Sequence, residues 1–88
     1  MDETLEKLKI QLDLQTWPDV YLFKFIVPNE PEKVAKVSAL FNDTALVSMH
    51  PSRKGNYISI SAKELMLDVN SIIQKYQEAS KINGLIAL

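Results

Sequence analysis

The chain has 88 residues, enough for one small domain, and its 47% hydrophobic and 24% charged residues are ordinary for a folded globular protein. It contains no cysteine, so disulfides, thiolate metal sites and cysteine nucleophiles are excluded. The formal net charge of −1 provides no surplus of lysine and arginine, which argues against nucleic acid as a partner. The acidic start Met1-Asp2-Glu3 differs from a secretory signal and no apolar run is long enough to cross a bilayer, so we expect a cytoplasmic chain without membrane contact.

The first segment, residues 1–16, contains leucines at helical spacing. They are Leu5, Leu8 and Leu12. A rival pattern is present as well, because apolar residues alternate from Leu8 to Leu14 as they do in a strand. We favour a helical segment or arm that Trp17-Pro18 ends, since a residue before proline avoids the helical conformation.

Residues 20–27 are rich in aromatic and β-branched side chains, which predicts a strand. Both of its faces are partly apolar, so we expect it to lie in the centre of a sheet. Asn29 is the expected cap of the next helix, with Pro31 in its first turn. Apolar residues at helical spacing continue to Phe41, which predicts that this helix ends near Asn42–Asp43.

Residues 46–50 and 57–62 predict two antiparallel strands joined by a hairpin. The connection contains Gly55, which can adopt the positive φ that tight turns need. The second of these strands alternates apolar and polar residues, as a strand buried on one face does.

Apolar residues from Leu65 to Tyr76 predict a second helix, for which Asp68 is the expected cap. Residues 81–88 predict the last strand. The resulting order of strand, helix, strand, strand, helix, strand predicts an α+β, two-layer sandwich of the ferredoxin-like βαββαβ type over residues 17–88. Its four-stranded antiparallel sheet would have the strand order 4-1-3-2.

Both helices of this fold would cover one face of the sheet and leave the other face half apolar. The residues expected on that outer face are Leu22, Lys24, Ile26, Ser48, His50, Tyr57, Ser59 and Leu85. Among them, Leu22, Ile26, Tyr57 and Leu85 are the expected contacts with a partner. A bare apolar face is unfavourable in water, so either the N-terminal segment or another protein chain is expected to cover it. The first hypothesis for function is therefore a non-catalytic binding or regulatory module that contacts a protein partner, including a second copy of itself.

The predicted hairpin gathers the residues best suited to an anion or ligand contact. They are His50, Ser52, Arg53 and Lys54. An RNA contact through this tip, with Tyr57 stacking on a base, is one hypothesis. The alternative, which we favour, is a solvated tip whose charges discourage edge pairing, because Ser59 stands where the RNA-recognition motif has a second stacking aromatic.

No arrangement of residues predicts catalysis or metal binding. His50 has no second ligand at zinc spacing, and nothing near it at a recognisable spacing would orient it as a base. Glu64 and Asp68 precede a predicted helix, where acidic residues have a structural reason to occur. We therefore expect no enzymatic activity, no metal and no cofactor.

Residues 51–60 resemble the Pro-Ser-x-Lys-Gly-x-Tyr-x-Ser signature of the YbeD-like bacterial family of unknown function. Trp17-Pro18 is similar to the aromatic-proline step of that family, whereas Ile58 and the connection Glu64-Leu65-Met66-Leu67 depart from its pattern. The resemblance covers most of the chain from Trp17 to Leu88. It implies a ferredoxin-like, cytoplasmic protein without known enzymatic activity, similar in shape to ACT domains.

Residues 29–41 also resemble the Asp-x-Pro-Gly-x-Leu-Ala-x-Val-x-x-Leu-Phe stretch of ACT domains, which bind amino acids. Glu32 departs from this pattern, because ACT domains place glycine there so that the backbone can approach the ligand. The resemblance implies a second hypothesis, a small-molecule sensor that binds its ligand near Pro28 to Glu32 at a dimer interface.

Overall fold

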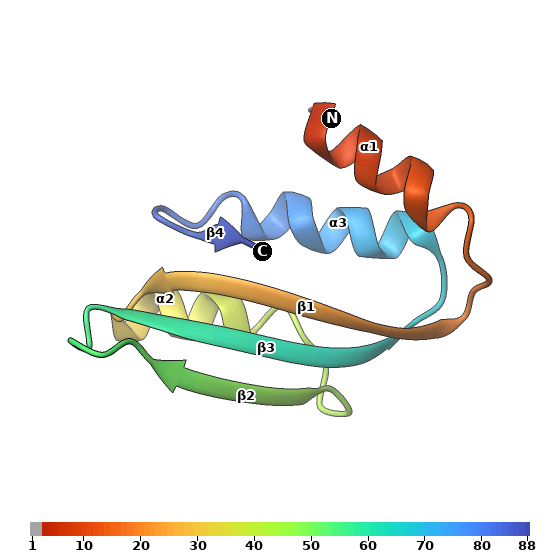
Figure 1. The fold of residues 1–88 in the computed structure, drawn as a ribbon. Helices are drawn as coiled ribbons and strands as arrows, with labels where there is room; N and C mark the ends of the chain where they lie inside the picture. The colour runs from red at the N-terminus through yellow and green to blue at the C-terminus, as the bar shows by residue number, and fades with distance from the viewer. Residues whose placement is uncertain (1–2) are drawn as a thin grey trace.

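The computed structural model describes residues 3–88, which form three helices and one four-stranded sheet (Figure 1). The helices are α1 (Glu3–Leu12), α2 (Pro31–Ser38) and α3 (Val69–Ala79). The strands are β1 (Asp19–Pro28), β2 (Leu46–Pro51), β3 (Tyr57–Met66) and β4 (Ile86–Ala87). The protein is thus α+β, and its elements follow one another in the predicted order.

The sheet is antiparallel throughout, with the strand order β2-β3-β1-β4. Read from the other edge, this order confirms the prediction of 4-1-3-2. Strands β1 and β3 pair over their whole length, from Asp19 opposite Met66 to Pro28 opposite Tyr57, and form the centre of the sheet. Strand β1 pairs with β3 on one side and with β4 on the other, which confirms the central position predicted from its two partly apolar faces.

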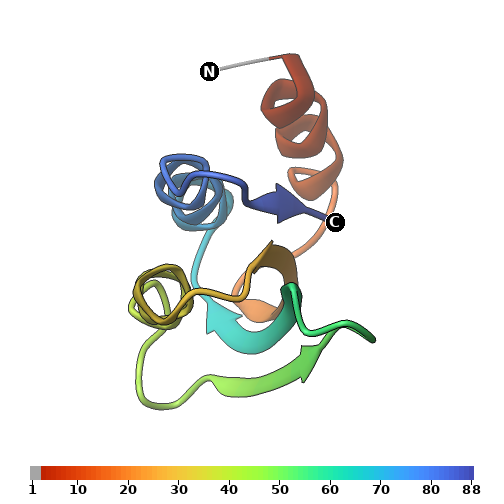
Figure 2. The same cartoon turned by 90° about the vertical axis from the view of Figure 1, so that its left-hand side faces the viewer.

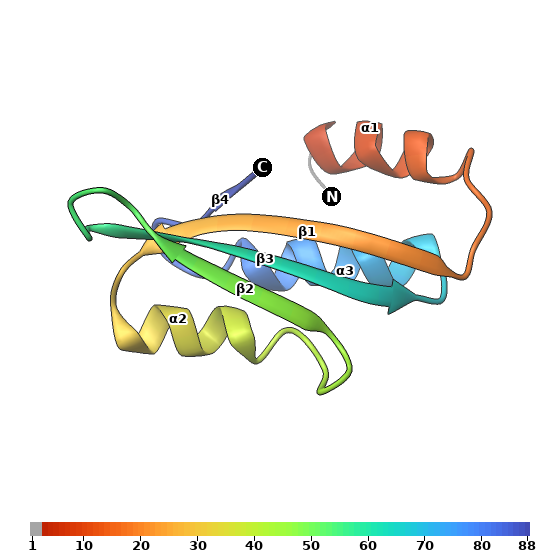
Figure 3. The same cartoon turned by 60° about the horizontal axis from the view of Figure 1, so that its bottom comes forward.

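Helices α2 and α3 lie on the same face of the sheet (Figure 3). Burial alternates along β1 and β3, and the buried side chains point to this face. The sheet side of the core consists mainly of Phe23, Phe25, Val27, Ile58, Ile60 and Ala62. Val37 of α2 and Ile72 and Ile73 of α3 pack on it from above.

Helix α1 confirms the helical interpretation of the N-terminal segment. Leu12 is buried in the core, and Leu5 and Leu8 pack against it. The indole Nε1 of Trp17 donates a hydrogen bond of 2.9 Å to the carbonyl oxygen of Leu12, which fixes the end of the helix. Helix α1 lies past β1 and next to α3, at the end of the sheet away from β2 (Figures 1 and 2), so its described part leaves the outer face open. Residues 1–2 of the predicted segment lie outside the described residues.

Helix α2 is shorter than predicted, because it ends at Ser38 rather than near Asn42–Asp43. A tighter turn of the 3₁₀ type follows Ser38. The amide of Leu40 donates to the carbonyl of Val37, and the amide of Phe41 donates to the carbonyl of Ser38, so both hydrogen bonds span three residues instead of four. The apolar spacing continues through this turn, which is why periodicity alone overestimates the helix.

Strand β3 is longer than predicted and reaches Met66, so Leu65 lies in a strand instead of in the following helix. Leu65 pairs with Val20 at the start of β1. The predicted cap of α3 is confirmed, because the Asp68 carboxylate accepts a 2.8 Å hydrogen bond from the amide of Ser71.

Strand β4 is much shorter than the predicted residues 81–88. Ile82 still makes a turn hydrogen bond to the last residue of α3, and Gly84 then reverses the chain with a φ of +82°. Pairing is therefore confined to two residues, and Ile86 takes the place on the outer face that Leu85 was expected to take. The prediction for Leu85 is wrong, because this side chain packs against the core.

Candidate functional site

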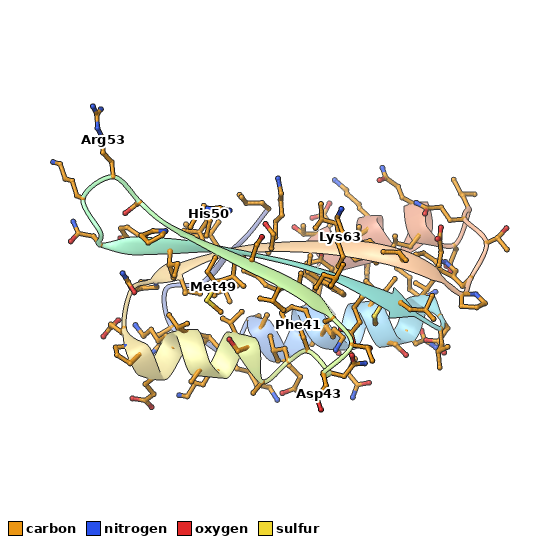
Figure 4. The ribbon with its side chains drawn as sticks, turned by 90° about the horizontal axis from the view of Figure 1, so that it is seen from below. Phe41, Asp43, Met49, His50, Arg53 and Lys63 are labelled. Atoms are coloured by element: carbon orange, nitrogen blue, oxygen red, sulfur yellow. The ribbon has the colours of Figure 1, made fainter. Side chains whose placement is uncertain are left out.

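The outer face of the sheet, which α2 and α3 leave uncovered, is the candidate functional site. Figure 4 shows Lys63 and His50 on this side of the sheet and Met49 and Phe41 on the helix side. Strand register extends the assignment to the other residues, since side chains at opposed positions share a face. Its apolar members are Val20, Leu22, Ile26, Leu46, Tyr57, Leu65 and Ile86.

Four aliphatic side chains surround one lysine near the middle of this face. Lys63 is opposite Leu22 of β1 and opposite Leu46 of β2, and Leu65 is its neighbour along β3. Val20 completes the group opposite Leu65. These aliphatic residues are 58% (Val20), 44% (Leu22), 72% (Leu46) and 60% (Leu65) exposed. We call this group, with Lys63 at its centre, the Lys63 patch.

A shallow hollow of about 240 Å³ overlaps the Lys63 patch at Leu22, Leu46 and Lys63. Its walls are Leu22, Leu46, Val47, Ser48, Ser61 and Lys63. Pockets that enclose cofactors or drug-sized molecules usually measure about 300–1,000 Å³. The hollow is therefore better matched to a side chain of a partner protein than to a cofactor.

The lysines of the helices and of the turn after α3 each have an acidic partner within 4.0 Å. The pairs are Lys7–Glu3, Lys9–Asp13, Lys33–Glu30, Lys36–Glu32, Lys75–Glu64 and Lys81–Glu78. Within residues 3–88 the other cations have no such partner: Lys24, Arg53, Lys54 and Lys63. All four belong to the outer face or to the hairpin beside it, so positive charge is left uncompensated on this side of the molecule.

The hairpin forms as predicted, and Gly55 has the expected positive φ of +77°. Ser52 serves the turn: its hydroxyl oxygen accepts a 3.1 Å hydrogen bond from the amide of Tyr57, and its carbonyl accepts one from the amide of Gly55. Arg53 points away from the body of the protein (Figure 4). His50 lies opposite Ser59 on the outer face, so the structure does not gather these side chains around one anion.

Asn29 connects this hairpin to the start of α2 and is not the helix cap that its position suggested. Its side-chain amide donates a 3.0 Å hydrogen bond to the carbonyl of Gly55, and its backbone amide donates to Asn56. The N-cap is Glu30, whose side chain makes no capping hydrogen bond.

The residues predicted for the outer face are placed unevenly. Leu22 and Tyr57 are 44% and 48% exposed, and Ile26 is half-buried beside Ile86. The sequence prediction omitted the lysine at the centre of the patch and Leu65 next to it. Their alternation along residues 57–66 was a usable signal, but the run Glu-Leu-Met-Leu favoured a helix.

A buried ion pair is the main polar feature that the sequence did not predict. Glu64 is only 5% exposed, and its Oε2 lies 3.3 Å from the ammonium of Lys75 without a hydrogen bond. The same ammonium donates to the carbonyl of Leu40 and lies 5.3 Å from the ring centroid of Phe41. Glu64 thus faces the helices from within β3, and it does not precede a helix as expected.

The ion pair lies beside a cleft of about 470 Å³ between α3 and the turn that follows α2. The lysine ammonium already has a carboxylate, a carbonyl and an aromatic ring as neighbours. These contacts tie α3 to the end of α2, and we interpret the pair as structural.

A second cleft, of about 480 Å³, lies at the start of α2, where the ACT-like hypothesis places a ligand. Four of its charged groups pair with one another, because Lys33 lies 2.9 Å from Glu30 and Lys36 lies 3.3 Å from Glu32. A ligand there would have to compete with these internal ion pairs.

Comparisons with protein-family models, with curated proteins and with solved structures find no match to this chain. The resemblances to the YbeD-like family and to ACT domains therefore stay predictions. Among the described helices, none combines the length and the apolar character that crossing a membrane requires.

Proposed function

We propose that this chain is a non-catalytic binding module with a ferredoxin-like βαββαβ core, similar to the YbeD-like proteins, and that it binds another protein through the outer face of its sheet. The observation that carries the proposal is the Lys63 patch, where four neighbouring aliphatic side chains are each at least 44% exposed. Clustered exposure of this kind is typical of interaction surfaces, whereas single exposed leucines are ordinary.

Covering the Lys63 patch would contribute a useful but limited part of a binding free energy. Each of its half-exposed aliphatic side chains would add about 1 kcal/mol when a partner removes the rest of its surface from water. The four together would add about 4 kcal/mol, which does no more than offset the loss of translational and rotational freedom on association. A stable complex therefore needs polar contacts as well, and the unpaired lysines nearby are suited to provide them.

The absence of cysteine permits a direct test. A single cysteine at Leu65 (Leu65→Cys) carries a photo-activated cross-linker on the outer face, and Gln77→Cys carries it on the exposed side of α3 as the matched control. Both proteins are irradiated in native lysate and analysed by mass spectrometry. We expect specific adducts from the Leu65 position that an excess of unlabelled chain removes, and none of these adducts from position 77.

Identical adducts from the two positions would contradict the proposal. Self-association is tested separately with the purified chain, by light scattering over a concentration series. A mass above 10.0 kDa that returns to the monomer value on Leu22→Ser plus Leu46→Ser would make a second copy the occupant of this face.

A small-molecule sensor is the second candidate function, because a cleft of about 480 Å³ lies where the ACT-like resemblance expects one. A thermal-shift panel of amino acids tests it. A rise in melting temperature that Lys36→Gln abolishes would support a ligand at the start of α2, and a flat panel would remove this candidate.

A further inference from the structure

We infer that the partner presents an acidic, aliphatic segment of polypeptide to the Lys63 patch, with a carboxylate at Lys63 and an aliphatic side chain in the neighbouring hollow. This inference rests on the proposed function, since it specifies the chemistry of a partner for the same face. Three observations carry it: the unpaired state of the cations, the shape of the hollow, and the kind of apolar residue around it.

The first observation is the contrast between the two sides of the molecule. Every lysine of the helices and of the turn after α3 in the described chain has a carboxylate within 4.0 Å, whereas Lys24 and Lys63 on the sheet have none. A partner that covered Lys63 with apolar groups alone would bury its ammonium without a counter-charge, which is strongly unfavourable. A carboxylate in the partner removes that penalty, so the position selects for acidic partners.

The second observation is the hollow of about 240 Å³ that Lys63 shares with Leu22 and Leu46. This volume leaves room for an aliphatic side chain of a partner. Because Lys63 is one of its lining residues, the same segment can place a carboxylate and an aliphatic group within a few residues of each other.

The positive charge also continues along the sheet. Lys24 is the outer-face residue next to Leu22 on β1, in the direction of the hairpin. It lies opposite Ser61, the outer-face neighbour of Lys63 on β3 in the same direction. Arg53 projects at the hairpin end on the same side of the sheet (Figure 4). A segment with several acidic residues that ran from the Lys63 patch toward the hairpin would meet one cation after another.

Two other occupants fit the face less well. A second copy packed face to face would bring the same unpaired lysines near one another, which is repulsive. RNA is bound largely by aromatic stacking, but the exposed apolar residues around Lys63 are all aliphatic and Tyr57 lies at the far end of the strand. RNA is an outcome of the test below, and a second copy is an outcome of the light-scattering experiment above.

The test is a selection from a random peptide library displayed on yeast, with the full-length chain as the target. We expect the enriched peptides to contain more glutamate and aspartate, and more leucine, isoleucine and valine, than the starting library. The best peptide, made synthetically, should bind Lys63→Gln about fivefold more weakly than the unmodified chain. Lys7→Gln, which removes an exposed lysine of α1 that is paired with Glu3, is the matched control and should leave the affinity unchanged.

The outcomes separate the two proposals. If no peptide is enriched, or if Leu22→Ser plus Leu46→Ser leaves binding intact while the fold is retained by circular dichroism, the face is not the binding surface and the proposed function fails. If binding needs these leucines but the peptides are not acidic, or Lys63→Gln binds equally well, only the present inference is overturned. Displacement of the peptide by oligouridylate RNA at similar concentration would also overturn it, in favour of nucleic acid.

Discussion

The ammonium of Lys75 and the carboxylate of Glu64 show what a single pair of residues does for this small core. Glu64 enters the core from the central strand β3, and the lysine reaches it from α3. Glu64 is the more deeply buried of the two, with 4% of its side chain exposed against 19% for Lys75. The pair therefore depends on the lysine to neutralise a charge that water cannot reach.

Lys75→Met is expected to lower the free energy of unfolding by about 3 kcal/mol, because it leaves the Glu64 carboxylate buried and uncompensated. The double variant Glu64→Leu plus Lys75→Met should recover much of this loss, since it removes both charges. Urea denaturation of both variants measures the effect. A double variant as unstable as the single one would show that the packing of Lys75, and not the charge, is what matters.

The hydroxyl groups of Tyr21 and Tyr76 lie 2.8 Å apart, and burial followed by this hydrogen bond raises the pKa of Tyr76. A raised pKa means that the folded state favours the neutral phenol. This contribution to stability is complete below the pKa of unfolded tyrosine, about 10, and is lost as the pH rises above it. We expect the free energy of unfolding to fall in that alkaline range.

Tyr76→Phe should flatten this alkaline dependence and lower stability at neutral pH by about 1 kcal/mol, the contribution of one hydrogen bond. The matched control is Tyr57→Phe on the exposed outer face, which should keep the dependence of the unmodified chain. Thermal unfolding between neutral and alkaline pH provides the comparison. Equal curves for the two variants would contradict the assignment to Tyr76.

At the scale of elements, the two glycines show how turns place the strands. Gly55 and Gly84 have φ values of +77° and +82°. A Cβ at Gly55 would have no atom within 4 Å, whereas a Cβ at Gly84 would lie 2.8 Å from Cγ of Pro28. The hairpin turn therefore needs glycine for its backbone angle alone, and the turn before β4 needs it also for space.

Gly55→Ala is expected to cost about 1 kcal/mol of stability, from the backbone conformation. Gly84→Ala should cost about 3 kcal/mol, because the Pro28 ring must move as well. Each variant serves as the control for the other in urea denaturation. Equal losses would show that Pro28 yields without strain.

The elements with local signals were predicted well. The apolar run of β1, the glycine of the hairpin and the Asp68 cap act over a few residues, so the sequence displays them directly. Residues 64–66 show the limit: glutamate, leucine and methionine favour helices, yet they form a strand because β1 pairs with them. Pairing between segments distant in sequence overrides local preference there.

The candidate site likewise contains some residues that a local sequence pattern predicts and others that depend on pairing between distant strands. Leu22 and Tyr57 could be assigned to the outer face by alternation. The patch around Lys63 was missed, because strand β3 was predicted to end at Ala62 and because the neighbours of Lys63 depend on the register of three strands. Leu85 was assigned wrongly since the start of β4 determines which of two adjacent residues faces out.

At the scale of the whole molecule, α1 is part of the core and not an independent arm. Leu12→Ala is expected to cost about 3 kcal/mol, because this side chain is only 3% exposed and its loss leaves a cavity. Leu14→Ala, at a position that is 85% exposed, is the control and should change stability by about 0.5 kcal/mol or less. Equal effects in thermal unfolding would mean that α1 is not packed as described.

The distribution of charge has a consequence for how the molecule moves toward a partner. Its net charge of −1 is nearly zero, but within residues 3–88 the cations without a carboxylate partner gather on the outer face and its hairpin, so the balancing negative charge lies elsewhere on the molecule. Such a separation creates a permanent electric dipole. In the electric field of an acidic protein, the molecule would rotate so that its sheet faces the partner before contact. Added salt screens this field, so productive encounters would become slower and less oriented. This salt dependence is expected even though the net charge of the molecule is close to zero.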